Sequence, residues 1–141
     1  MPKFINTNGG WSFCNNTNLQ TVIFGDAITS LGGYSFAGDT SLTTVIFGAN
    51  SSFSLGGYCF DGCTNLTTLT NITNCTKLGN NVFRNCSNLG NNKTLELNLT
   101  SQDSNPEEFL SNTKYKRLII HWPNSIPDGW RSNYPLWSYM A

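Results

Sequence analysis

Five cysteines and one histidine are the residues of this sequence whose types most readily support chemistry. An imidazole beside a cysteine can activate the thiolate as a nucleophile, and two cysteines spaced like Cys59 and Cys63 can supply half of a zinc site. The only histidine, His121, follows an apolar run and precedes Trp122, which is typical of a structural residue on a strand. No histidine stands near Cys59 and Cys63 in the sequence to complete a zinc site. We therefore expect no catalytic residues, no metal ion and no cofactor.

The cysteine count also bears on disulfides. The five cysteines are Cys14, Cys59, Cys63, Cys75 and Cys86. An odd number leaves at least one thiol unpaired, so a complete disulfide framework is excluded. We expect these side chains to be buried thiols that pack as small hydrophobic groups.

Composition narrows the classes of partner. The chain has 141 residues, and its eight Lys and Arg balance its eight Asp and Glu, so the formal net charge is zero. A nucleic-acid partner requires clustered basic residues that follow the phosphates, and we therefore expect none. Apolar stretches such as Val22–Phe24 are only three or four residues long, so no segment is expected to insert into a membrane. Nine Phe, five Tyr and four Trp still supply apolar mass for the core of one domain or one repeat array.

A repeated unit organises most of the chain. The motif Gly-Gly-Trp-Ser-Phe at 9–13 returns as Gly-Gly-Tyr-Ser-Phe at 32–36, as Gly-Gly-Tyr-Cys-Phe at 56–60, and more loosely at 79–83. The final phenylalanines are 23 or 24 residues apart, and a leucine follows each of them six residues later. Such self-similarity predicts a solenoid, in which each coil contributes a short strand and stacking buries the apolar face. The Gly-Gly pairs predict tight corners between coils.

Alternation along each strand separates inward from outward residues. The inward set expected for the first coil is Phe13, Leu19, Val22, Phe24, Ile28 and Leu31. Stacking in register should leave two outward columns, which together form what we call the Thr/Ile face: Thr21, Thr44 and Thr68, then Ile23, Ile46 and Thr70. This face is flat and uncharged, which suits hydrogen bonding to a protein or a glycan. An ordinary solvated face of β-branched residues is the alternative interpretation.

The repeated units resemble the BspA-like leucine-rich repeat. Residues 34–47 and 58–69 follow its pattern, roughly A-F-x-G-C-x-x-L-x-x-I-x-I-P, and the resemblance covers about residues 9–99. Cys63 and Cys86 occupy the cysteine position of the pattern, where Asn16 and Asp39 stand in the first two coils. We expect an inward column there with reduced thiols; a disulfide between Cys63 and Cys86 is the alternative. The resemblance implies a β-rich solenoid, a leucine-rich repeat array of about four 23-residue coils, over residues 1–100.

The fourth coil departs from the repeat. Residues 90–93 are inserted before Thr94–Leu99, whose alternation predicts a strand. We expect this strand to continue the ladder of the preceding coils.

Composition shifts near Ser101, and we expect residues 101–141 to form a small α+β C-terminal cap or an assembly segment. Asn105 and Pro106, followed by Glu107 and Glu108, predict the start of a short helix that ends near Asn112. The two glutamates are therefore expected to stabilise the helix start rather than act as acid and base. A strand is predicted over 114–122 and a turn over 127–129.

Aromatic residues of this segment have two interpretations. They are Trp122, Trp130, Tyr134 and Trp137. A hydrophobic cap would protect the last strand of the solenoid from edge-to-edge pairing. An exposed patch would instead contact a partner, since aromatic residues are enriched in interfaces, and such a patch would allow a homo-oligomer or a larger assembly.

The resemblance implies a non-catalytic, protein- or glycan-binding module for surface adhesion or recognition. The first residues lead straight into polar sequence, without the apolar region and cleavage site of a signal peptide. If the chain is full length, we expect cytoplasmic synthesis without Sec export. The alternative is therefore a bacteriophage virion structural or accessory protein, such as a capsid decoration or fibre-associated subunit, because lysis releases virions without an export signal. The expected location is the cell surface or the virion.

Overall fold

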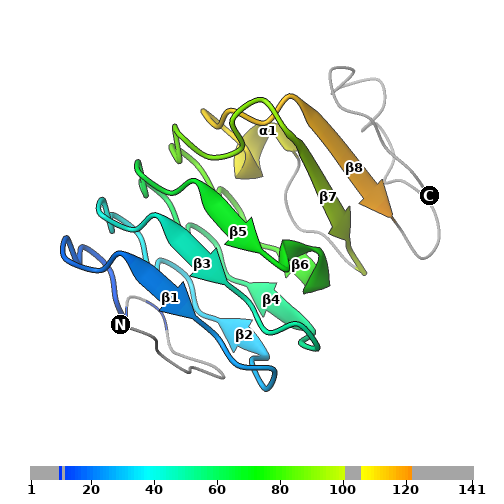
Figure 1. Cartoon of the computed structure of the whole chain (residues 1–141), viewed down its shortest axis with the longest axis horizontal. Coiled ribbons are helices and arrows are strands. Elements are labelled where there is room, and N and C mark those ends of the chain that lie inside the picture. The colour runs from blue at the N-terminus through cyan, green and yellow to red at the C-terminus, as the bar shows by residue number, and fades with distance from the viewer. Residues whose placement is uncertain (1–9, 11, 101–105, 122–141) are drawn as a thin grey trace.

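The computed structural model describes residues 10, 12–100 and 106–121, and it shows short parallel strands stacked in a solenoid (Figure 1). Three parallel sheets make up the array. The first contains β1 (Thr21–Ile23), β3 (Thr44–Ile46) and β5 (Thr68–Thr70). The second contains β2 (Ser30–Leu31), β4 (Phe53–Leu55) and β6 (Cys75–Leu78), and the third pairs β7 (Thr94–Asn98) with β8 (Arg117–His121). The fold class predicted from the repeat is confirmed.

Helical structure is scarce among the described residues. There, a 3-10 turn, η1, spans Ile72–Asn74, and one short helix, α1, spans Pro106–Phe109. None of the helices in the described ranges is long and apolar enough to cross a membrane.

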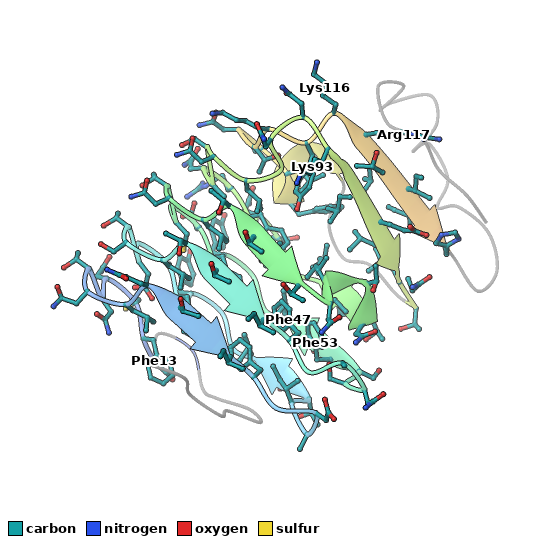
Figure 2. All side chains as sticks on the ribbon, viewed as in Figure 1. Phe13, Phe47, Phe53, Lys93, Lys116 and Arg117 are labelled. Atoms are coloured by element: carbon teal, nitrogen blue, oxygen red, sulfur yellow. The ribbon has the colours of Figure 1, made fainter. Side chains whose placement is uncertain are left out.

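Phenylalanine columns form the centre of the core. Phe36 stacks between Phe13 and Phe60, with 5.3 Å between ring centroids on each side, and Phe60 lies 5.8 Å from Phe83. Figure 2 shows a second contact inside the solenoid, where the ring of Phe47 packs on that of Phe53, at 4.3 Å. Regular spacing of the phenylalanines in sequence thus becomes regular stacking in space, because each coil adds one ring to the column.

The inward set predicted for the first coil is confirmed. Four of its members are fully buried: Val22, Phe24, Ile28 and Leu31. Phe13 and Leu19 are partly buried and pack against the same core. Since Val22 pairs with Val45, and Val45 with Leu69, the alternation repeats from coil to coil.

The fourth coil differs from the expectation. Thr94–Asn98 does form a strand, but β7 pairs with β8 and not with β5, so the ladder of the first three coils stops at β5. In the third coil one residue separates Leu66 from β5, whereas four residues separate Leu89 from β7. The inserted turn has positive φ at Gly90, Asn91 and Asn92, and the Asn92 N–H donates to the Lys114 carbonyl at 2.7 Å. This turn ties β7 to the next coil, and the insertion therefore interrupts the sheet.

The segment after residue 105 continues the stack. The Phe83 N–H donates to the Phe109 carbonyl at 3.1 Å, which places α1 next after Phe83 along the array. The helix ends at Phe109 rather than near Asn112, because the chain turns there and Asn112 adopts a left-handed φ of 59°. β8 begins three residues later than the strand predicted over 114–122 and ends within it, while the turn predicted over 127–129 lies outside the described residues.

Candidate binding face

The Thr/Ile face forms as two straight columns. Thr21 pairs with Thr44 and Thr44 with Thr68, while Ile23 pairs with Ile46 and Ile46 with Thr70. The side chains of this face are half-buried on β1 and β3 and exposed on β5. The stacking predicted for these six residues is therefore confirmed; their role in binding stays a prediction.

Hydrogen bonds along the edge of this face fix its hydroxyl groups. The Thr67 hydroxyl donates to the Thr43 carbonyl and the Thr43 hydroxyl to the Gln20 carbonyl, each at 3.2 Å. Each of these hydroxyls also lies 3.3 Å from the hydroxyl of the next threonine, Thr68 or Thr44. The result is an ordered row of exposed hydroxyl oxygens, next to isoleucine methyl groups, without any charge on β1, β3 or β5.

On the strands next to this face, charged residues appear at β7 and β8, beyond the break in the sheet. On the outer side of β7 and β8, the Glu96 carboxylate lies 2.6 Å from Nε2 of His121. Lys116 and Arg117 project from the start of β8 (Figure 2) and are exposed. His121 thus pairs with a surface carboxylate and not with a thiol, so the arrangement does not support a Cys–His nucleophile.

The thiols are poorly suited to nucleophilic chemistry. Burial raises the pKa of Cys59 far above its ordinary value and that of Cys75 to about 12, so both remain protonated near neutral pH. All five cysteines are free thiols. Cys63 donates to the Phe36 carbonyl at 3.1 Å and Cys86 to the Phe60 carbonyl at 3.0 Å, which is the inward column predicted for them.

Asp39 occupies the same column without sulfur. The carboxyl group is fully buried; its Oδ1 accepts a hydrogen bond from the Asn16 N–H at 2.6 Å, while its Oδ2 has no partner among the described residues. Burial raises the pKa of Asp39 to about 7, and the hydrogen bond from Asn16 opposes the shift. A protonated carboxyl is the state that fits this position best.

Sequence reasoning missed an aromatic ladder at the corners of the solenoid. Tyr34 stacks on Tyr58 with 4.7 Å between centroids, and the Arg84 guanidinium lies 4.9 Å from the Tyr58 ring. Arg84 makes two hydrogen bonds to Asp61, at 3.0 and 2.7 Å. The repeated Gly-Gly-Tyr is the sequence signal of this ladder, although by itself it predicts only a corner. A hollow of about 460 Å³ lies beside this ladder, over Gly33, Gly56 and Gly57.

A second feature that the sequence did not reveal is a groove between β5 and β7, which we call the β5–β7 groove. Its volume is about 370 Å³, and its lining includes Leu69 and Thr68 on one side and Thr94 and Glu96 on the other. It lies where the ladder is interrupted, and Thr68 of the Thr/Ile face is part of its lining. Figure 1 shows β7 following β5 along the array.

Two other predictions were a metal-free chain and an aromatic contact patch. Within the described ranges, no three side chains of the His, Cys, Asp or Glu type come together as a metal site would require. The aromatic residues proposed for the C-terminal patch, Trp122, Trp130, Tyr134 and Trp137, lie outside the described residues.

Comparison with known proteins identifies the repeat. A family model described as "BspA type Leucine rich repeat region" matches residues 2–126 in six copies. No curated protein sequence is similar enough to count as a match.

Solved structures of bacterial leucine-rich repeat proteins share the fold. A leucine-rich repeat protein from T. pallidum superposes with a TM-score of 0.66 at 15% identity, over 82% of this chain and 52% of that one. A leucine-rich cell surface protein from Faecalibacterium prausnitzii gives 0.62 at 23% identity, over 82% and 33%. A leucine-rich repeat protein from Bacteroides ovatus gives 0.64 at 16% identity, over 99% and 42%. The chain thus spans between a third and about half of these proteins, and the likeness concerns the fold.

Proposed function

The chain belongs to the BspA-type leucine-rich repeat family, and from this membership we propose that it is a non-catalytic recognition module that binds a protein or a glycan through its Thr/Ile face. The family is a repeat scaffold for binding, and its stacked strands present the same outward position again and again. The finer assignment, to one face and to these two ligand classes, is the proposal.

The register of the outward columns is the observation that carries it. Three strands align Thr21, Thr44 and Thr68 in one row, beside a row that begins with Ile23 and Ile46. Rows of hydroxyl and methyl groups at strand spacing of about 4.8 Å suit a ligand with repeated polar and apolar groups. The absence of charge on β1, β3 and β5 favours a neutral ligand surface over an ionic one.

We place this activity at a cell surface. One protein with the same fold is described as a leucine-rich cell surface protein of Faecalibacterium prausnitzii, of which this chain spans 33%. The alternative remains a structural or accessory subunit of a bacteriophage virion, in which the same face would contact neighbouring subunits or the host.

A pair of matched charge variants tests the face. In one variant, Thr44→Lys with Ile46→Lys places two ammonium groups in the centre of the Thr/Ile face. In the control, Ala49→Lys with Ser52→Lys adds the same charge at exposed positions of the same coil, outside the face. The fluorescently labelled chains would be applied to a glycan array and to an array of immobilised secreted proteins.

We expect the natural chain and the control variant to bind the same spots and the Thr44→Lys, Ile46→Lys variant to lose them. Circular dichroism should show the same fold for all three chains. Equal binding by both variants would remove the Thr/Ile face from consideration, and no binding by any chain to either array would contradict a recognition module for these ligand classes.

A further inference from the structure

The β5 strand is more exposed than its neighbours, although it lies in the middle of the array. Val22 on β1 and Val45 on β3 are fully buried, whereas Leu69, which occupies the same inward position on β5, is only partly buried. Thr68 and Thr70 are likewise more exposed than their partners on β3. β5 is the last strand of its sheet, and no strand of the described residues pairs with its outer edge, because β7 pairs with β8 instead. The missing neighbour explains the greater exposure of β5.

Hydrogen bonds join the third and fourth coils on both sides of the β5–β7 groove. On one side of the β5–β7 groove the Gly62 N–H donates to the Arg84 carbonyl at 2.9 Å, and the Asn88 side chain donates to the Thr64 carbonyl at 2.8 Å. The third and fourth coils are thus joined before the strands begin.

They are joined again after the strands end. The Asn98 side chain donates to the Thr73 carbonyl at 3.3 Å, and the Thr100 N–H donates to the Thr76 carbonyl at 2.9 Å. Between these two clamps no ladder pairs β5 with β7. The groove is therefore a bounded opening between two strand edges.

Both edges present main-chain groups to the groove. The main-chain groups of Thr68 and Thr70 point toward β3, since the Thr68 N–H donates to the Thr43 carbonyl and the Thr70 carbonyl accepts from the Phe47 N–H. Successive residues of a strand address opposite sides, so the N–H and C=O of Leu69 face the groove.

The same reasoning applies to β7. The Lys93 carbonyl and the Leu99 N–H bond to the β8 side, with Lys116 and His121 as partners. The alternate residues Thr94 and Glu96 therefore direct their main-chain N–H and C=O groups toward β5.

We propose that the β5–β7 groove binds an extended peptide segment of a partner protein, which inserts as an additional strand and pairs with Leu69 on one edge and with Thr94 and Glu96 on the other. Two facing strand edges present donors and acceptors at the repeat of an extended main chain, and peptide recognition by strand addition uses such edges. A glycan lacks a main-chain repeat of this kind, so the edges select a peptide.

The lining also indicates the side chains of this peptide. Leu69 and Leu95 line the inner side, so the residue that points inward should be apolar. Lys93 lies in the lining at the start of β7, near Lys116 (Figure 2), and both side chains are exposed. A strand inserted parallel to β7 would place its N-terminal end beside these two cations, where acidic residues fit best.

The experiment has one part that needs no ligand. In an isotopically labelled full chain, hydrogen exchange measured by NMR should be slow at the Thr68 amide, which donates to Thr43, and fast at the adjacent Leu69 amide. Slow exchange at Leu69 in the free chain would overturn the proposal, because that edge would already be paired.

The second part uses a defined probe, fluorescein-Glu-Glu-Thr-Thr-Val-Ile-Phe-Gly-amide, whose last six residues repeat residues 43–48, the strand that already pairs with the other edge of β5. Its control has the same side chains but N-methyl groups on alternate residues, which remove main-chain donors. We expect saturable binding of the probe by fluorescence anisotropy, at least about tenfold weaker binding of the control, and slowed exchange at Leu69 and Glu96.

Two protein variants locate the binding. Leu69→Glu should weaken binding of the probe by about tenfold or more, and Ser52→Glu, which adds the same charge at an exposed position outside both the groove and the Thr/Ile face, should leave it unchanged. Equal binding of the N-methylated control, retention of binding in Leu69→Glu, or no saturable binding of the probe would each overturn the proposal. Thr44→Lys with Ile46→Lys changes no residue that lines the groove. This variant should therefore still bind the probe, even where it no longer binds the ligand of the Thr/Ile face, so failure of one proposal is distinguishable from failure of the other.

Discussion

At the scale of single residues, Asp39 shows how one position accepts two chemistries. The same inward column holds buried thiols at Cys63 and Cys86, each donating to a backbone carbonyl. A protonated carboxyl resembles a thiol, because it also carries a donor hydrogen and no charge. The sequence alignment of the coils placed these residues together, but it could not reveal that the Asp39 Oδ2 lacks a partner.

This position predicts a dependence of stability on pH. The folded pKa of Asp39 is about 7 because of burial, above an unfolded value of about 3.9. Between these values the folded chain binds more protons than the unfolded chain, so the free energy of unfolding decreases as pH rises from 4 to 7 and the loss is complete above pH 7. Asp39→Asn keeps an acceptor for the Asn16 N–H and does not titrate.

We therefore expect the Tm of the natural chain to fall relative to that of Asp39→Asn as pH rises from 5 to 8. Differential scanning calorimetry of both chains in matched buffers measures this difference, and other titrating groups cancel in the comparison. A difference in Tm that does not change with pH would show that Asp39 does not titrate in this range.

Phe36 lies at the centre of the column of stacked phenylalanines in the core. It is fully buried and stacks on Phe13 and Phe60, each at 5.3 Å. Phe36→Ala should lower the free energy of unfolding by about 3–5 kcal/mol, measured by urea denaturation. Thr40→Ala, at an exposed position of the same coil, should change it by only about 0.5 kcal/mol. A loss below about 1 kcal/mol for Phe36→Ala would contradict the register of the core.

At the scale of the elements, the first three coils could be predicted because each strand repeats the one before it. The alternation Thr21, Val22, Ile23 recurs as Thr44, Val45, Ile46, and matched sequences stack in matched register. The strand at Thr94–Asn98 was also predicted, but its partner was not. Pairing depends on where the inserted turn at residues 90–93 directs the chain, and no other coil contains such a turn to compare.

The glycine corners give a prediction at this scale, because two adjacent glycines differ in the space around them. A Cβ at Gly56 would lie 2.6 Å from the Gly33 nitrogen and 2.9 Å from the Leu31 carbonyl oxygen, both backbone atoms. A Cβ at Gly57 would come no closer than 3.4 Å to Asn80. Gly56→Ala should therefore cost about 1–3 kcal/mol more than Gly57→Ala in urea denaturation. Equal losses would contradict the close approach of the coils at this corner.

At the scale of the whole molecule, one repeated unit determines the fold and leaves the ligand open. Stacking in register explains the core, the corners and the Thr/Ile face together, and these follow from the repeat. A solenoid fold is compatible with many functions, so the identity of the partner depends on the outward residues and not on the coils. The β5–β7 groove lies where the fourth coil departs from the repeat, so the regular spacing of the repeat does not predict it.

The central claim is that a free Thr/Ile face serves recognition, and the solution mass of the untagged chain by light scattering tests it most directly. The account predicts a single species near 15.6 kDa, with the same mass for the Thr44→Lys, Ile46→Lys variant. A closed oligomer that dissociates in this variant would contradict the account, because the face would then be occupied by copies of the chain, as in a structural subunit of an assembly.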